Sequence, residues 1–316
     1  MAQKEDDSSA STRTMRTMSK EGIPPQEFPT QYVRGLPFFL SSRFSKENIE
    51  AAIDYQPQDG DIITASYPKT GTTWLQYIVL QILSKGSSFP SFNDVLFKEA
   101  PYLEMSGTAP IEALKKPRVY KHHLPYNMVK KNEKAKLLYI HRNPEDTLVS
   151  FYHFMQNLNF NFDTNFNQYV EDFMSANVPY GSYFEHVKSY LSHKDDSNLL
   201  ILTYEGLHKN MKERILKIAK FLGEDYFNRI SNDDLLLNKI MKQTCFENMK
   251  NNLSYVIRDT FTKDSLKNEP RKVEFFRKGT TGDGKKYLSP DQQNRLREIA
   301  EKILEGTDVV AKWYSK

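Results

Sequence analysis

Cysteine is nearly absent from this chain of 316 residues, in which Cys245 is the single example. One thiol excludes an intrachain disulfide and argues against a metal site built from cysteines. Long apolar runs are also missing, because none approaches the roughly 20 residues that a membrane-spanning helix needs. The N-terminus has no apolar signal-peptide core either. These absences predict a cytoplasmic protein that does not associate with a membrane.

The chain also lacks a strong excess of charge, since 44 Lys and Arg against 40 Asp and Glu give a formal net charge of +4. This balance does not suggest a nucleic-acid-binding protein. Basic residues nevertheless gather between Arg271 and Lys286, where Glu274 and Asp283 are the acids. Such a run is either a solvated surface or a contact for an anionic ligand.

The organisation of the chain is simple. Residues 1–27 are mostly polar and have no apolar period, which predicts a flexible tail. Residues 28–316 contain no linker and no internal repeat, so we expect one large domain. Within it, short apolar runs alternate with helical patterns, which predicts an α/β fold with a parallel sheet flanked by helices. The expected strands are 61–66, 118–121, 136–140 and 198–203, and the expected helices 73–83, from Pro144 onward, 166–174, 183–191 and 209–222.

Three stretches without a clear period are expected to form loops and the walls of a pocket: residues 38–44, 89–107 and 260–289. The helix after residue 143 is well marked, because Asn143 suits an N-cap and Pro144 the first helical position.

The most informative segment, residues 62–79, reads as an apolar strand, a tight loop and an amphipathic helix. A helix N-terminus offers free backbone N–H groups to an anion, Gly71 permits close approach, and Lys69 adds a full positive charge. The pattern is P-loop-like, yet Lys69 precedes Gly71, so the nucleotide-triphosphatase order G-x-x-x-x-G-K-[ST] is absent. The alternative is an ordinary strand-to-helix turn with surface hydroxyls.

Ligands of parallel α/β sheets bind at the carboxyl ends of the strands. Three of the four predicted strand ends carry cationic or proton-accepting side chains, and Glu205 is the one acid that keeps a magnesium site open. The strand ends are 67–73, 121–123, 141–142 and 204–205. They predict a polyanionic ligand that is bound without a metal.

The loop Tyr-Pro-Lys-Thr-Gly-Thr-Thr-Trp at 67–74 resembles the 5′-phosphosulfate-binding loop of the cytosolic sulfotransferases. That family transfers a sulfuryl group from 3′-phosphoadenosine 5′-phosphosulfate (PAPS) to a hydroxyl or amine and releases PAP. The resemblance continues in three further segments up to about Gly284. It implies a PAPS-dependent enzyme acting on a small, aromatic or other alcohol acceptor such as a phenol, catecholamine or steroid. The loop would hold PAPS through Lys69, Thr70, Gly71, Thr72, Thr73 and Trp74.

Residues 119–125 resemble the family's K-T-H-L-P segment, in which the His is the general base. Two histidines stand side by side here. The motif and strand alternation both select His123, which shares a face with Lys121, whereas His122 points away. The resemblance implies an in-line displacement with His123 as base, Lys69 on the oxygen that bridges phosphate and sulfate, and Lys121 on a sulfate oxygen.

Residues 139–154 resemble the family's 3′-phosphate site, which implies that Arg142 and Ser150 bind this phosphate. A third contact would come from Arg277, Lys278 and Gly279. Gly284 stands where the family commonly has Trp, so we expect a more mobile loop there. Around the adenine, the resemblance places Trp74, Tyr204, Thr244, Phe246 and Met249, with Cys245 in place of a usual Ser.

By position, the acceptor pocket would be lined by Phe38, Phe39, Tyr102, Phe151 and Phe154, each of which also suits a plain core position. The family's dimer motif falls on residues 285–294 but has lost its Thr-Val and Glu, so a dimer is not inferred. Two rival functions are a magnesium-dependent P-loop kinase and a nucleotide-binding relative without activity. The sequence does not identify the acceptor.

Overall fold

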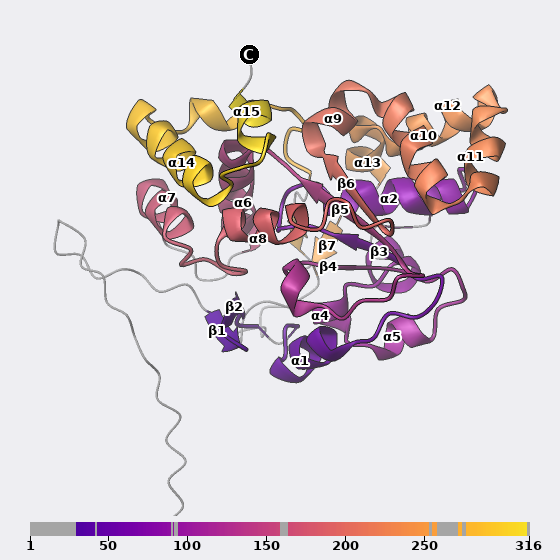
Figure 1. Cartoon of the computed structure of the whole chain (residues 1–316), viewed down its shortest axis with the longest axis horizontal. Helices are drawn as coiled ribbons and strands as arrows, with labels where there is room; N and C mark the ends of the chain where they lie inside the picture. Colours follow the sequence, from indigo (N-terminus) through magenta and orange to yellow (C-terminus); the bar gives the residue numbers. More distant parts are fainter. Residues whose placement is uncertain are drawn as a thin grey trace, which may run out of the picture.

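The computed structural model describes residues 30–41, 43–89, 91, 94–158, 164–252, 255–257, 271–273 and 276–314. The predicted tail, 1–27, lies outside these ranges. Four parallel strands form the central sheet in the order β4-β3-β5-β6. They are β3 (Ile62–Ala65), β4 (Val119–His122), β5 (Lys136–His141) and β6 (Leu199–Thr203). The expected α/β fold with a parallel sheet is therefore confirmed, and Figure 1 shows helices on either side of it.

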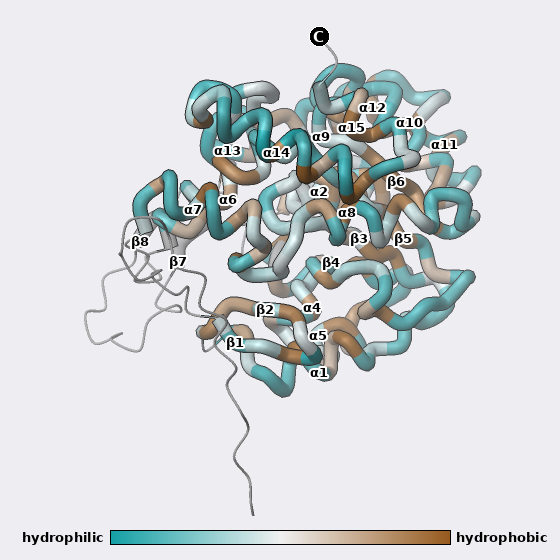
Figure 2. The backbone as a smooth tube through the Cα atoms, turned by 60° about the vertical axis from the view of Figure 1, so that its left-hand side comes forward, coloured by the Kyte–Doolittle hydropathy of each residue, from teal (hydrophilic) through white to brown (hydrophobic). Residues whose placement is uncertain are grey.

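Side-chain alternation along β5 explains the two helical layers. Tyr139 stacks on Tyr190 of α8 (Tyr183–Leu191), with 3.7 Å between ring centroids. The Lys136 ammonium lies 5.0 Å from the ring centroid of Phe221 in α10 (Met211–Leu222). Because residues an odd number apart point to opposite faces of a strand, α8 and α10 cover opposite faces of the sheet. Figure 2 shows the brown strands inside and the teal outer faces of α10, α11 (Glu224–Ser231) and α14 (Pro290–Ile303).

The helix α2 (Thr72–Leu83) follows β3 and is buried along most of its length. It packs against β3 and β4 and is covered by α10, α11 and α12 (Asp234–Thr244). Its buried residues, which include Gln76 and Gln81, lie on every side of the helix, so the amphipathic helix expected from the sequence is wrong here. The helix is therefore a fixed support for the loop that precedes it.

Local signals located most of the other helices well. The helix α6 (Pro144–Leu158) begins as expected, because Asn143 Oδ1 accepts the backbone N–H groups of Glu145 and Asp146 at 2.9 and 3.3 Å. The expected helix 209–222 is wrong at its start, since α9 (Tyr204–Lys209) ends at Asn210 and α10 begins at Met211. Further helices are α1 (Lys46–Asp54), α5 (Ala109–Glu112), α7 (Phe166–Met174), α13 (Phe246–Asn252) and α15 (Val309–Tyr314).

The stretches expected to be loops contain short elements. The strand β2 (Leu36–Phe39) pairs with β1 (Thr30–Val33), and the stretch 89–107 holds a π-helical turn (Val95–Glu99) and α4 (Leu103–Ser106). Long-range contacts fix α4, because Asn48 Nδ2 donates to the Met105 carbonyl at 3.1 Å. Such contacts leave no period in the sequence. The last stretch, 260–289, is described from 271 with gaps and contains β8 (Arg271–Val273), paired with β7 (Tyr255–Ile257), and the 3-10 turn Gly284–Lys286.

The order of the strands creates the site. The strand β3 is central, and the next strands along the chain, β4 and β5, lie on its two sides. The chain therefore leaves the carboxyl end of β3 in one direction and returns on the other, which opens a crevice at that edge of the sheet.

Candidate active site

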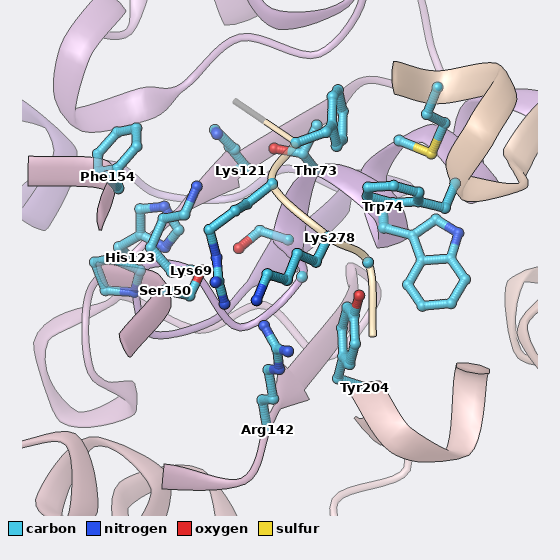
Figure 3. Close-up of a pocket in the computed structure, with 18 of the residues that line it drawn as sticks. Lys69, Thr73, Trp74, Lys121, His123, Arg142, Ser150, Phe154, Tyr204 and Lys278 are labelled. Atoms are coloured by element: carbon cyan, nitrogen blue, oxygen red, sulfur yellow. The ribbon is translucent and has the colours of Figure 1, made fainter. Parts of the chain in front are cut away.

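A cavity of about 320 Å³ opens at this edge of the sheet (Figure 3). Its wall takes residues from the ends of all four strands, from α6 and from the segment 276–280. The predicted site residues that line it are Phe39, Lys69, Gly71, Thr72, Thr73, Trp74, Tyr102, Lys121, His123, Arg142, Ser150, Phe154, Tyr204, Phe246, Met249, Arg277, Lys278 and Gly279. The crevice thus joins positions that lie more than 200 residues apart in the sequence.

The floor of the cavity is the loop between β3 and α2. Lys69 (φ 70°) and Gly71 (φ 109°) both adopt left-handed conformations, which turn the chain sharply into the helix. A Cβ on Gly71 would lie 2.8 Å from Tyr204 Cδ2, so glycine is required here. The Thr70 hydroxyl donates to the carbonyls of Tyr67 and Ile140 and does not face the cavity. The backbone N–H groups of the first turn of α2 have no acceptor within the helix and are suited to bind an anion at this end of the cavity.

Two lysines face the cavity, Lys69 from the loop after β3 and Lys121 from β4. Burial, together with the nearby cations Lys121, Arg142 and Arg277, lowers the pKa of Lys69 to about 7. Burial also lowers the pKa of Lys121 to about 8, although the buried Glu104 acts in the opposite direction. Each ammonium lies over an aromatic ring, Lys69 over Phe154 at 4.3 Å and Lys121 over Tyr102 at 4.6 Å. An incoming anion would favour the charged form of both.

Of the two adjacent histidines, His123 lines this cavity and His122 does not. His123 Nδ1 lies 2.7 Å from the Ser66 carbonyl oxygen, which only accepts, so Nδ1 carries the proton. Burial, with the charge of Lys121, keeps the pKa of His123 well below its usual range. The ring is therefore neutral, with an unprotonated Nε2. Burial also lowers the pKa of His122, to about 3.

Arg142, directly after β5, is held on three sides. Its guanidinium donates to Asp146 Oδ2 at 3.3 Å and to the Thr280 carbonyl at 2.7 Å, and it lies 4.2 Å from the Tyr204 ring centroid. Its Nε is buried without a hydrogen-bond partner among the described residues. A buried donor without a partner is uncommon and is the kind of group that a ligand oxygen satisfies. In Figure 3 the side chains of Arg142 and Lys278 point toward the same space.

The segment 277–284 packs against α6, and its residues 277–280 line the cavity. Asp283 pairs with Lys278 at 2.8 Å and with Arg277 at 3.1 Å. The backbone of Gly284 donates to Asp146 Oδ1 at 2.7 Å, and a Cβ at this position would lie 2.4 Å from the Glu145 carbonyl carbon. Glycine at 284 therefore allows direct backbone packing on α6. The expected mobility of this loop stays a prediction.

Aromatic side chains form another part of the wall. Trp74 Nε1 donates to the Thr244 carbonyl at 2.8 Å, and its ring meets Tyr204 edge-on with 5.3 Å between centroids. The Thr244 hydroxyl is buried and bonds the Ile240 carbonyl at 2.8 Å, so it does not line the cavity. Its neighbour Cys245 does. A flat heterocycle is the ligand such a wall suits.

Two predicted pocket residues do not line the cavity, because Phe38 and Phe151 are fully buried in the core. Phe38 packs edge-on against Tyr180, and Phe151 against Tyr67. Several lining residues were not expected individually from the sequence, although the first four lie in stretches that were expected to form pocket walls: Phe44, Met105, Phe276, Thr280, Pro68, His208 and Met211. Phe44 and Met105 lie in stretches without periodicity, so no local signal distinguished them.

Glu205, the acid left open for a magnesium ion, lines a different cavity. Its Oε1 accepts the backbone N–H of Asn143 at 2.8 Å and so supports the start of α6. No group of three His, Cys, Asp or Glu suited to a metal occurs among the residues that the structure describes. Over the same residues, no helix combines the length and apolarity needed to span a bilayer.

Comparison with known proteins points in one direction. A family model described as "Sulfotransferase domain" matches residues 59–308. Sulfotransferase 1B1 of Mus musculus is 36% identical over 289 residues, which cover 87% of this chain and 92% of that protein. The 3-alpha-hydroxysteroid sulfotransferase of Cavia porcellus is 35% identical over 274 residues, covering 83% and 90%. The crystal structure of mouse sulfotransferase SULT7A1 complexed with PAP superposes with a TM-score of 0.70 at 28% identity, covering 90% and 98%.

Proposed function

This chain belongs to the sulfotransferase family, and from that premise we propose that it transfers the sulfuryl group of PAPS to the hydroxyl of a small, apolar, uncharged acceptor. It is a PAPS-dependent enzyme. The proposal adds the acceptor class and the base, His123. The observation that carries it is a neutral imidazole in a cavity with Lys69 and Lys121.

The cavity suits PAPS on several grounds. The start of α2 presents N–H groups and Lys69 for the 5′-phosphosulfate. The unpartnered Nε of Arg142, together with Ser150 and Arg277, suits a second phosphate at the other end. Trp74, Tyr204, Phe246 and Met249 offer apolar surfaces for the adenine. PAPS would supply an activated sulfuryl group, whose charge is lower than that of a phosphoryl group.

His123 is the proposed general base. Its Nδ1–H is held by the Ser66 carbonyl and its backbone carbonyl accepts His186 Nε2 at 3.0 Å, so the ring cannot easily turn. The unprotonated Nε2 would accept the proton from the acceptor hydroxyl as that oxygen attacks in line. A neutral imidazole with a fixed, unprotonated Nε2 is available to accept a proton at neutral pH.

Lys69 and Lys121 are the proposed electrostatic stabilisers. Lys69 would follow the charge that develops on the leaving phosphate, and Lys121 would bind a sulfate oxygen. Ammonium groups already in position need little reorganisation during the reaction. Since the transferred group carries less charge than a phosphoryl group, these cations should be sufficient without a metal.

The lining favours a hydroxyl over a protonated amine. The acceptor end has the aromatic rings of Phe39, Phe44, Tyr102 and Phe154, and no Asp or Glu stands among the described residues that line the cavity. A cationic acceptor would face Lys69 and Lys121 without a compensating carboxylate, which costs binding energy. We therefore place neutral phenols and steroid alcohols ahead of amines and catecholamines.

Turnover with labelled PAPS and a panel of phenols, steroids, flavonoids and catecholamines tests the proposal. We expect neutral hydroxyl compounds to react best, with rates unchanged in excess EDTA. Preference for an amine would contradict the acceptor class. Loss of activity with chelator and recovery with magnesium would contradict the metal-free mechanism and make Glu205 a candidate ligand.

The base is tested by His123→Ala, which should lower kcat by about a hundredfold or more with little change in PAP affinity. His122→Ala is the matched control, because His122 is equally buried but does not line the cavity. A larger loss in the control would make the assignment of His123 wrong.

A further inference from the structure

A buried carboxylate stands beside the proposed base and has no part in the mechanism above. Glu104 belongs to α4 and has no exposed surface. Its Oε1 accepts the backbone N–H of His123 at 2.6 Å, and its Oε2 is buried without a hydrogen-bond partner among the described residues. A carboxylate in such a place is costly unless it meets a specific need.

The first need is a hydrogen-bond acceptor for a backbone N–H at the edge of the sheet. The strand β4 is an outer strand, and on its open side the Lys121 N–H donates to the Pro101 carbonyl at 3.0 Å, in a single bridge between Tyr102 and Lys121. Two residues on, the His123 N–H points to the same side, where the neighbouring chain has already turned into α4. Glu104 Oε1 takes the place that a strand carbonyl would have held. A buried N–H would otherwise lack a partner.

Together with the bonds already described, this one fixes His123 at three points. Its N–H is held by Glu104, its carbonyl by His186, and its ring Nδ1 by the Ser66 carbonyl. The three partners come from different parts of the chain. The direction of Nε2 therefore depends on all three.

The His123 N–H does not itself require a charged acceptor, because the oxygen of a neutral amide would accept it as well. The second need is therefore a negative charge that acts on another group. Glu104 interacts electrostatically with Lys121, Tyr102, Tyr180 and Tyr190. Burial keeps the pKa of each of these tyrosines well above its usual range, so they stay neutral. Lys121 is thus the cationic group among them, and the Glu104 carboxylate favours its charged form.

We propose that Glu104 is a positioning residue of this site, whose side chain holds the backbone of His123 in place and whose negative charge, when present, favours the charged form of Lys121. The inference rests on the proposed roles of His123 and Lys121. Glu104 does not line the cavity, so we expect it to contact neither the acceptor nor PAPS. Its effect reaches the reaction through its two neighbours.

Loss of the negative charge of Glu104 should lower the pKa of Lys121. Burial raises the pKa of Glu104 to about 8 and lowers that of Lys121 to about 8, so Glu104 becomes negatively charged over the same pH range in which Lys121 loses its proton, and each charge favours the other. In Glu104→Gln the amide still accepts the His123 N–H, but the negative charge is lost. Lys121 should then lose its proton at a lower pH than in the parent protein.

Competitive labelling of lysines with trace acetic anhydride between pH 6 and 10, read by mass spectrometry of the peptide containing Lys121, measures this directly. In Glu104→Gln we expect the labelling midpoint of Lys121 to fall by about one pH unit or more. Asp172→Asn is the matched control, because Asp172 is also a buried carboxylate with an unpartnered oxygen and lies away from the cavity. An unchanged midpoint in Glu104→Gln would overturn the proposed role of the charge.

Turnover separates the two roles. Glu104→Gln should lower kcat by roughly tenfold at pH 8 with the KM of the acceptor within about twofold, and Glu104→Ala by roughly a hundredfold, since His123 then loses its anchor. Glu104→Asp keeps the charge but shortens the reach, so it should preserve the Lys121 midpoint and still lower kcat. Parent-like kcat in all three variants would overturn the positioning role. Absence of turnover in the parent protein would instead contradict the proposed function, while the labelling midpoint still tests Glu104.

Discussion

The cationic side chains at the two ends of the cavity have different neighbours. At the end formed by α6 and the segment 277–284, carboxylates pair the cations: Asp146 holds Arg142, and Asp283 holds Arg277 and Lys278. At the end formed by β3 and β4, Lys69 and Lys121 lie over aromatic rings. Asp283 raises the pKa of Lys278, whereas burial lowers those of Lys69 and Lys121 to about 7 and 8.

We propose that this difference separates the binding of the cofactor from the chemical step. Cations paired with carboxylates keep their charge and geometry before any ligand arrives, which suits the recognition of a fixed phosphate. Cations in a less polar wall gain most when negative charge appears beside them, which suits a group that must respond to the reaction. Variants at the two ends should therefore fail in different ways.

The largest expected effect is the loss of turnover in Lys69→Met, at the end of the cavity formed by β3 and β4. The side chain keeps its apolar length but loses the ammonium, so we expect kcat to fall by about 10²–10³. PAP should still bind, because the paired cations are intact. Turnover and PAP titration of the same preparation, with circular dichroism to check the fold, measure this. A normal kcat in this variant would remove Lys69 from the mechanism.

Arg142→Ala should instead weaken the binding of PAP at the end of the cavity formed by α6 and the segment 277–284. PAP at about 100 times its Kd should stabilise the parent protein by about 2.7 kcal/mol, or roughly 4 °C in Tm for a chain of this size. 5′-AMP and ATP at equal concentration should stabilise it much less, because they lack the 3′-phosphate. In Arg142→Ala the advantage of PAP should largely disappear. Equal shifts with ATP in the parent protein would favour the kinase instead.

The smallest expected effect is an uptake of protons when PAP binds, which can be measured on the parent protein without a mutation. Lys69 has a pKa lowered to about 7, so at pH 8 it is mostly neutral in the free protein. A bound phosphate raises this pKa, and the complex should take up a fraction of a proton, on the order of one at most, per PAP bound. Calorimetry in two buffers of different ionisation enthalpy measures the uptake. Release of protons at pH 8 would contradict the assignment to Lys69.

Local signals in the sequence predicted the supporting elements well. Asn143 and Pro144 mark the start of α6, and the loop before α2 combines Lys69 and Gly71 at the end of an apolar strand. Caps, glycines and apolar runs act within a few residues, so their effect can be read from a short segment. The same holds for the strand alternation that placed Lys121 and His123 in the cavity and His122 outside it.

The parts that could not be predicted depend on contacts between distant segments. Phe151 and Phe154 lie on one helix, yet the first is core and the second lines the cavity, which depends on what packs against each. Glu104 lies in a stretch without periodicity, and its partner is a backbone group 19 residues away. The acid that pairs with Arg277 and Lys278 was visible as Asp283, but only the folded chain brings the three together.

The bonds around Asp146 also bear on how long the protein survives. Asp146 accepts the N–H groups of Gly282 and Gly284, and Arg142 donates to Thr280, so contacts across up to 138 residues of sequence join α6 to the C-terminal part of the chain. A ligand that bridges Arg142 and Arg277 would strengthen the same junction. Its binding energy would then oppose the local opening through which proteases gain access. The supply of nucleotide would in this way set the lifetime of the enzyme as well as its rate.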